Sequence, residues 1–195
     1  ELLKEKGLAE PTSYEDLIKP EFKGLLSMPN PKSSGTGYMF LKNLVNAWGE
    51  EKAFAYFDKF AENIVQFTSS GSGPMNALVQ KEAAVALGMT GQAVTMLNEG
   101  APFKIVFFEE GAPCSLYGHA ITKKAESRAD YDKVKEVFDY LVKVVTPACD
   151  AKFFPEQVFV DKVFTLPKYP TDIPYGDMSN NTTEEKTRLL GKWMY

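Results

Sequence analysis

The chain has 195 residues with a formal net charge of −4, and 44% of its residues are hydrophobic. This composition supports a packed core, and its mild acidity argues against the basic surface that nucleic-acid-binding proteins need. No run of about 18 apolar residues occurs, so we expect no membrane span. His119 is the single histidine of the sequence, which excludes zinc sites built from several histidines, and we predict neither a metal site nor a cofactor.

The two cysteines, Cys114 and Cys149, leave two alternatives open. They are too few for a disulfide scaffold or a cysteine-based zinc site. They could form one bridge in an oxidising compartment, or they could be two buried thiols. The cysteine count by itself does not determine the compartment.

The first part of the chain predicts an alternation of helices and strands. Ser13 begins a first helix, with Asp16 as the acid of a capping box and Pro20 as its end. A buried strand, an amphipathic helix closed by Gly49, a second helix and a second strand then follow. They are expected at 24–28, at 38–48, from 50 onward and at 63–67.

The alternation continues through residue 122, which predicts an α/β fold with a largely parallel sheet. The expected elements are helices at 75–81 and 92–98 and strands at 83–89, 103–108 and 116–121. The clearest helix of the chain spans 131–145, where apolar residues recur at helical spacing. Four prolines between 153 and 180 favour extended structure, and a last helix is expected at 184–193.

Two turns rich in serine and glycine are the features most suggestive of binding. Each follows a predicted strand and precedes a predicted helix, so its backbone N–H groups and hydroxyls can face an anion. In an open α/β sheet such turns lie at the carboxyl ends of strands, where ligands bind. The candidate residues are Ser33, Ser34, Gly35, Thr36, Ser70, Gly71, Ser72 and Gly73. The alternative is that these residues only cap helices.

Other candidates for ligand contacts are isolated. Thr90 and Gln92 follow a predicted buried strand and could face a cleft, and Glu110 could accept sugar hydroxyls. A solvated loop pair is an equally good interpretation of Glu109 and Glu110, and His119 fits a structural histidine. No acid–base pair suggests a catalytic residue, so we expect a protein that is not an enzyme.

The ordered motifs resemble the extracellular solute-binding proteins of ABC importers, in the group of ferric-iron-binding and hexose-phosphate-binding proteins. The resemblance covers residues 8–145, and residues 150–195 match poorly. The motifs that carry it are Asp16–Gly24, Met28–Pro31, Ser34–Gly37, Gly49–Ala53, Asn63–Val65, Ser70–Pro74 and Glu110–Gly111.

The resemblance implies a type II periplasmic-binding-protein fold, with two α/β lobes joined by two crossover strands. It implies that this chain is a C-terminal fragment, mostly one lobe plus part of the other. Residues 1–104 would form the second lobe, 105–146 a return segment belonging to the first lobe, and 147–195 a C-terminal segment. A complete protein of this kind would be monomeric and extracytoplasmic, in the periplasm or at the cell surface, with a possible lipid anchor on the N-terminal part.

The function that the resemblance implies is delivery of a small anionic solute to a membrane permease. We favour a phosphorylated or phosphonate-type organic anion, with sugar phosphate as the leading subclass. The alternative is a ferric-iron-binding protein with a synergistic anion, although 89–93 lack the adjacent tyrosines of the iron-binding members. A transferase on the same fold is a third hypothesis.

Overall fold

The computed structural model describes residues 1–155 and 160–195, and the chain forms two compact units. Unit 1 comprises Glu1–Cys114 and Pro170–Tyr195, and unit 2 comprises Ser115–Tyr169. Unit 1 therefore extends beyond the predicted boundary at 104 and also includes the end of the chain. The assignment of 1–104, 105–146 and 147–195 to lobes stays a prediction, and 156–159 of the last segment lie outside the described residues.

A small parallel sheet forms the centre of unit 1. Its strands are β1 (Leu26–Pro29), β2 (Ile64–Thr68) and β3 (Val85–Ala86), in the order β2-β1-β3. Both neighbours run parallel to β1, with Leu26 opposite Ile64 on one side and Val85 on the other. The predicted α/β class with a parallel sheet is confirmed.

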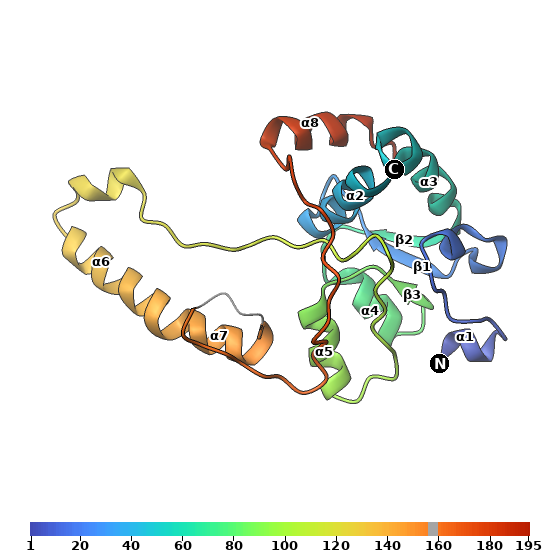
Figure 1. The fold of residues 1–195 in the computed structure, drawn as a ribbon, viewed down its shortest axis with the longest axis horizontal. Helices are drawn as coiled ribbons and strands as arrows, with labels where there is room; N and C mark the ends of the chain where they lie inside the picture. Colours follow the sequence, from blue (N-terminus) through green and yellow to red (C-terminus); the bar gives the residue numbers. More distant parts are fainter. Residues whose placement is uncertain (156–159) are drawn as a thin grey trace. The chain divides into compact units, whose positions relative to one another are not determined.

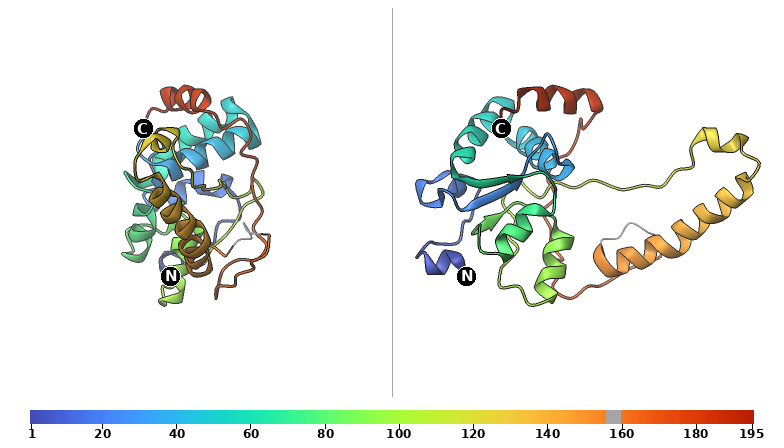
Figure 2. Two further views of the ribbon diagram at one scale, coloured as in Figure 1. Left: turned by 90° about the vertical axis from the view of Figure 1, so that its left-hand side faces the viewer. Right: turned by 180° about the vertical axis from the view of Figure 1, so that it is seen from behind.

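Helices cover both faces of this sheet, as Figure 1 and the rear view in Figure 2 show. The helices α2 (Gly35–Trp48) and α3 (Glu50–Asn63) lie on one face, and α4 (Gly73–Val79) and α5 (Thr90–Asn98) lie on the other. A short helix α1 (Leu2–Glu5) stands near the N-terminus. Gly49 ends α2 at φ 84°, a backbone conformation that glycine adopts without steric cost.

The predicted first helix is replaced by two 3-10 helices, η1 (Glu15–Ile18) and η2 (Pro20–Phe22). The capping box itself is present: the Asp16 N–H donates to Ser13 Oγ at 3.2 Å, and the Ser13 N–H donates to Asp16 Oδ2 at 3.2 Å. Pro20 disfavours the α conformation in the residue before it, so the segment is too short for an α-helix.

The hydrophobic core of unit 1 depends on its last helix, α8 (Thr183–Lys192). Leu189 and Trp193 are 0% and 1% exposed and belong to the same cluster as the apolar residues of α2 and α3. The Trp193 ring packs edge-to-face against Phe57 at 5.2 Å between ring centroids. The C-terminal segment, which the sequence left without a role, thus completes this core.

Three predicted strands differ from the structure. The strand expected at 83–89 pairs only at Val85–Ala86, and neither 103–108 nor 116–121 forms a strand. A β-strand needs a neighbour for its N–H and C=O groups. Within the described residues, neither segment is hydrogen-bonded into the sheet.

Unit 2 consists mainly of helix. It contains η3 (Lys123–Ser127), α6 (Tyr131–Tyr140), a π-helical turn η4 (Leu141–Val145) and α7 (Thr146–Phe153). The helix predicted at 131–145 therefore continues past Pro147. At the π turn the Thr146 hydroxyl donates to the Leu141 carbonyl at 2.9 Å, and Pro147 falls at the start of α7, where its missing N–H costs little.

The structure also bears on the state of the two cysteines and on the expectation of no membrane span. Cys114 and Cys149 form no disulfide and both are exposed, so the interpretation as buried thiols is wrong. Neither cysteine belongs to the hydrophobic core, so neither thiol is shielded from solvent. Among the described helices, none combines the length and apolarity that a membrane span requires.

Candidate functional site

The two Ser/Gly turns, 33–36 and 70–73, both lie where a strand of the parallel sheet ends and a helix begins. The first connects β1 to α2, and the second connects β2 to α4. Because β1 and β2 are hydrogen-bonded parallel neighbours, their carboxyl ends meet at one edge of the sheet. The Asn30 N–H donates to the Thr68 carbonyl at 2.8 Å, which joins the two turns at their starting points.

The first turn presents a helix N-terminus. Ser34 caps α2: its Oγ accepts from the Gly37 N–H at 3.4 Å, and the residue is buried. Gly35 and Thr36 occupy the first turn of α2, where backbone N–H groups have no partner within the helix. Ser33 is exposed and donates to the Asn30 carbonyl at 3.5 Å. A Cβ on Gly35 would meet no atom within 4 Å, so its face is open.

The second turn presents two hydroxyls. Ser70 Oγ and Ser72 Oγ lie 3.2 Å apart, and Ser72 makes no side-chain capping bond to α4. Thr68 donates from its hydroxyl to the Ser70 carbonyl at 2.8 Å and shapes the turn from inside. A Cβ on Gly73 would lie 2.5 Å from the Thr68 Cβ, so this close approach requires glycine.

The two turns pack against each other. A Cβ added to Gly71 would collide with the Thr36 hydroxyl, and it would lie 3.6 Å from Ser34 Oγ. The second turn therefore touches the first turn of α2 with backbone alone. This proximity cannot be read from the sequence, where the two turns are separated by two helices and a strand.

A third helix start adjoins the second turn. Thr90 is the first residue of α5 and Gln92 is the third, so α5 begins two residues earlier than the sequence predicts. Gln92 Nε2 donates to the Ser72 carbonyl at 3.3 Å. Gln92 Oε1 is buried and accepts no hydrogen bond within the described part of the chain. The structure thus places Gln92 against the second Ser/Gly turn, and Thr90 begins the same helix.

Glu110 is the one predicted site residue that the structure places elsewhere. Its Oε1 accepts from Trp48 Nε1 at 3.1 Å, at the C-terminal end of α2. Ser34 caps the opposite end, and a helix of this length spans about 20 Å. Glu110 is therefore not gathered with the turns, because the segment that carries it packs beside Trp48 and Asn43.

Asn30 and Thr68 support the turns, and the sequence analysis missed both. Asn30 Oδ1 accepts from the Lys32 N–H at 2.9 Å, and its Nδ2 donates to the Tyr195 carbonyl at 3.0 Å. An asparagine that bonds to the backbone two residues later is typical of turns, so the Pro-Asn-Pro sequence was a usable signal for Asn30. No comparable signal marks Thr68, whose role depends on the approach of Gly73.

Outside the turns, the residues that the structure describes add no second candidate site. His119 is exposed, and its Nε2 lies 2.9 Å from Thr146 Oγ1 in unit 2. Across the described ranges, no group of three or more His, Cys, Asp or Glu residues is arranged to hold a metal ion. The turns combine the N-terminus of α2 with the hydroxyls of Ser70 and Ser72, and such groups suit an anion that accepts hydrogen bonds.

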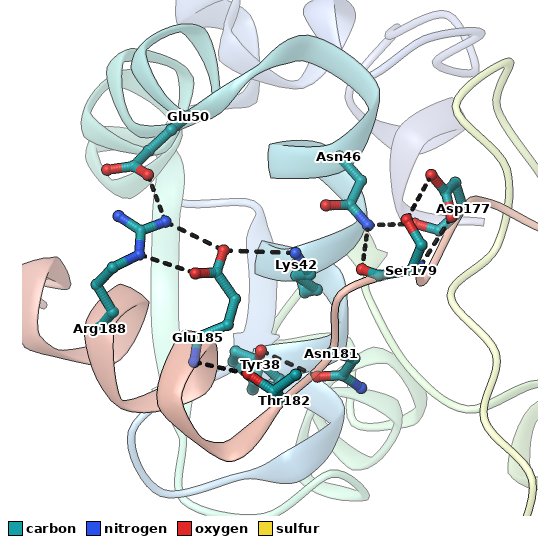
Figure 3. Close-up of polar contacts among 10 residues, drawn as sticks. All are labelled: Tyr38, Lys42, Asn46, Glu50, Asp177, Ser179, Asn181, Thr182, Glu185 and Arg188. Atoms are coloured by element: carbon teal, nitrogen blue, oxygen red, sulfur yellow. Dashed lines mark hydrogen bonds and ion pairs between the residues drawn. The ribbon is translucent and has the colours of Figure 1, made fainter.

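The helix that carries the first turn is held by polar contacts with the C-terminal segment (Figure 3). Tyr38 donates to Asn181 Oδ1 at 3.0 Å. Asn46 Nδ2 donates to the carbonyls of Asp177 and Ser179 at 2.8 and 3.1 Å. Lys42, almost fully buried, pairs with Glu185 at 3.5 Å. These contacts orient α2, and with it the first Ser/Gly turn.

Arg188 joins this network to the start of α3. It forms ion pairs with Glu185 at 2.8 Å and with Glu50 at 2.6 Å, and Lys192 also pairs with Glu50. Hydrogen bonds from Arg188 and Lys192 lower the pKa of Glu50 to about 2. The hydrogen bond from Arg188 also lowers the pKa of Glu185. Both carboxylates are therefore ionised at neutral pH and anchor α8.

Comparison with known proteins identifies relatives of this chain in sequence and in fold. A family profile described as bacterial extracellular solute-binding protein matches residues 1–171. The solved structure of the periplasmic binding protein AfuA from Actinobacillus pleuropneumoniae, with exogenous fructose-6-phosphate bound, is 27% identical with a TM-score of 0.79. The structure of the periplasmic binding protein P5PA is 26% identical with a TM-score of 0.74. These likenesses extend over 98% of this chain in both cases.

The chain spans only part of these relatives. It covers 61% of the AfuA chain and 62% of the P5PA chain. A protein of Haemophilus influenzae, itself uncharacterised, is 33% identical over 128 residues, which are 65% of this chain and 37% of that protein.

Proposed function

We propose that this chain, which belongs to the family of bacterial extracellular solute-binding proteins, contributes to binding a small phosphorylated or phosphonate-type organic anion. Sugar phosphate is the favoured subclass. In this proposal the Ser/Gly turns hold the anionic group, and Thr90 and Gln92 border it. A binding role rather than catalysis accords with the family, whose members are solute-binding proteins.

The packing of the two turns is the observation that carries this proposal. Gly71 lies against Thr36, which puts the second turn, with its Ser70 and Ser72 hydroxyls, beside the first turn of α2. A phosphate group accepts several hydrogen bonds at once and is stabilised by the positive end of a helix dipole. Turns that served only to cap their own helices would not need this close approach of a glycine to the neighbouring turn.

The preference for a sugar phosphate has independent support. AfuA, a structural relative over nearly the whole chain, is described with fructose-6-phosphate bound. Gln92 offers a buried side-chain oxygen beside the second turn. Such an oxygen can accept a hydrogen bond from a sugar hydroxyl.

Delivery to a membrane permease completes the proposal. In the complete protein, solute contacts on two lobes would stabilise a closed state that the permease recognises. The protein would act outside the cytoplasm, as a monomer in the periplasm or at the cell surface, where a lipid anchor would hold it. Contacts from this chain alone should bind solute weakly, because part of the contact set is missing.

A thermal-shift panel tests the proposal. The protein is expressed with any further residues that its gene encodes. Its Tm is then measured in the presence of sugar phosphates, phosphonates, inorganic phosphate and ferric citrate. A ligand at 100 times its Kd stabilises the folded state by about 2.7 kcal/mol, which raises the Tm by several degrees. A shift with a phosphorylated compound and none with ferric citrate supports the proposal. A shift with iron alone overturns it in favour of the ferric-iron alternative.

The variant Gly35→Leu tests whether the anion is bound at the first Ser/Gly turn. The position is open, so the new side chain should fill the space before the first turn without a clash and should abolish the solute-induced shift. Gly191→Leu is the matched control, because Gly191 in α8 is also open to at least 4 Å. Solute binding that survives Gly35→Leu would refute the placement of the anion at the turns.

A further inference from the structure

A buried asparagine in the middle of α2 has no role in the proposed solute contacts. Asn43 is 1% exposed and lies among the apolar residues of the helix. An amide in such a place is costly unless it is hydrogen-bonded. Asn43 Nδ2 donates to two successive carbonyls, that of Glu110 at 3.3 Å and that of Gly111 at 3.0 Å.

Asn43 holds the segment through which the chain leaves unit 1. Unit 1 ends at Cys114 and resumes at Pro170, so two segments connect it to the remainder of the chain. These two segments are paired within unit 1. The Ala112 N–H donates to the Pro174 carbonyl at 2.6 Å, and the Gly176 N–H donates to the Ala112 carbonyl at 2.9 Å.

Two glycines allow the pair to reach the asparagine. A Cβ on Gly176 would collide with Asn43 Oδ1 and would lie 2.8 Å from the Glu110 carbonyl oxygen. A Cβ on Gly111, whose φ is +79°, would lie 2.5 Å from the Gly176 backbone nitrogen. Any larger residue at either position would separate the segments from each other or from α2. Asn43, Gly111 and Gly176 therefore form one interlocked contact, which we call the Asn43 clamp.

We propose that Asn43 is a positioning residue that holds both connecting segments against α2, the helix whose N-terminus carries the first Ser/Gly turn. Ser34 and Asn43 lie on one continuous helix, so the turn and the two connections move as one body. Opening and closing would then occur beyond the clamp, after Ala112 and before Pro174. The role of the clamp in opening and closing rests on the proposed solute-binding function, whereas the contact itself can be tested without solute.

Hydrogen exchange in Asn43→Leu tests the clamp. Leucine fills a similar volume but donates no hydrogen bond. We expect the amides of Ala112 and Gly176 to exchange roughly 10-fold faster or more, while those of Leu41 and Leu44 in α2 stay protected. Asn46→Leu is the matched control: it removes two amide-to-carbonyl bonds from the same helix but only to Asp177 and Ser179. The control should leave Ala112 and Gly176 unchanged.

A second variant covers the case in which leucine prevents folding. Asn43→Asp keeps the shape but turns an acceptor toward the Glu110 and Gly111 carbonyls, and the same loss of protection is expected at neutral pH. Unchanged exchange at Ala112 and Gly176 in the folded variants, or equal loosening in Asn46→Leu, would overturn the clamp.

Solute binding then tests the coupling to the Ser/Gly turns. In the presence of the phosphorylated compound that shifts the Tm of the unaltered protein, Asn43→Leu should weaken binding about 10-fold or more, and Asn46→Leu should not. Loosened exchange with unchanged affinity would overturn the coupling. If no compound binds the unaltered protein, the proposed function fails, while the exchange data still decide the clamp.

Discussion

Helices α2 and α6 have the same kind of sequence pattern and different surroundings. Both are amphipathic, with apolar residues recurring at helical spacing. Eight of the 14 residues of α2 are buried, whereas none of the 10 residues of α6 is. Val137 and Tyr140 of α6 are each 59% exposed. A periodic pattern thus indicates that a face is suited to packing, but it does not indicate what the face packs against.

The difference lies in the elements available around each helix. In unit 1, α2 packs on β1, α3 and α8, and α8 comes from the far end of the chain. In unit 2, α6 packs mainly against η3 and the π turn η4, which adjoin it in sequence. An exposed apolar face of this kind marks a surface that is suited to packing against a further element or a partner.

The largest effect that we expect from a single substitution concerns the core of unit 1. Trp193→Ala should destabilise the chain by about 3–5 kcal/mol, because the buried ring packs against Phe57 and Phe67. Urea unfolding followed by circular dichroism measures this. Tyr117→Ala, at an aromatic residue that is 98% exposed in unit 2, is the control and should change stability by less than about 0.5 kcal/mol. Similar costs for both variants would contradict the contrast between the units.

A smaller effect is expected at the start of α8. Thr182 Oγ1 accepts from the Glu185 N–H at 3.2 Å, so Thr182→Ala should cost about 1 kcal/mol through loss of the N-cap. Thr187→Ala is matched to it, because that hydroxyl donates to the Thr183 carbonyl inside the same helix. This control should change the midpoint of unfolding little. An equal cost for the two variants would mean that the cap does not hold α8.

The attachment of α8 should also weaken in acid. Hydrogen bonds from Arg188 and Lys192 lower the pKa of Glu50 to about 2, and Arg188 also lowers the pKa of Glu185. A carboxyl whose pKa is lowered in the folded state stabilises that state at any pH above its ordinary pKa of 4.5. This contribution is lost as the pH falls from 4.5 toward 2. Because these pairs are near the surface, the contribution should be about 1 kcal/mol or less.

Stability measured from pH 7 to pH 3 checks this expectation. Arg188→Gln removes the shared partner of both carboxylates and should flatten the acid limb of the profile. Glu51→Gln changes the neighbouring carboxylate of α3 and should leave the limb as it is. An unaltered limb in Arg188→Gln would show that the acid sensitivity arises elsewhere.

The smallest expected effect is the most direct test of the comparison between α2 and α6. Val137→Lys places a charge on the exposed apolar face of α6 and should change the stability of this chain by less than about 0.5 kcal/mol. The same substitution in a longer form of the protein should cost more, if further residues cover the face. A cost above about 1 kcal/mol in this chain alone would mean that the face is already packed.

Much of unit 1 could be predicted from its sequence because the signals are local. Helical spacing and Gly49 located α2 and α3, and β-branched residues between turn residues located β2. The Ser/Gly turns were correctly placed between strands and helices for the same reason. The helix predicted to end at 145 continues past Pro147, because a π turn lets the helix continue.

The candidate site was only partly predictable because its assembly is not local. The two Ser/Gly turns lie side by side, with Gln92 against the second, but the contact of Gly71 with Thr36 requires β1 and β2 to be neighbours. A glutamate at position 110 could contact a solute or Trp48, and the sequence does not distinguish these roles. Only the path of its segment through the fold decides between them. The strands expected at 103–108 and 116–121 depended likewise on neighbours that the sequence does not specify.

The sequence by itself determined the positions of α2 to α6 and of α8, which turns expose backbone N–H groups, and to which family the chain is similar, because propensity, capping and motif order are encoded within a few residues. The tertiary structure alone decided that the end of the chain completes the core through Trp193, that Asn43 bonds to a segment distant in sequence, and that α6 keeps an exposed apolar face. These outcomes depend on contacts between residues far apart along the chain, and the energy of such contacts comes from burial and hydrogen bonding that no local pattern specifies.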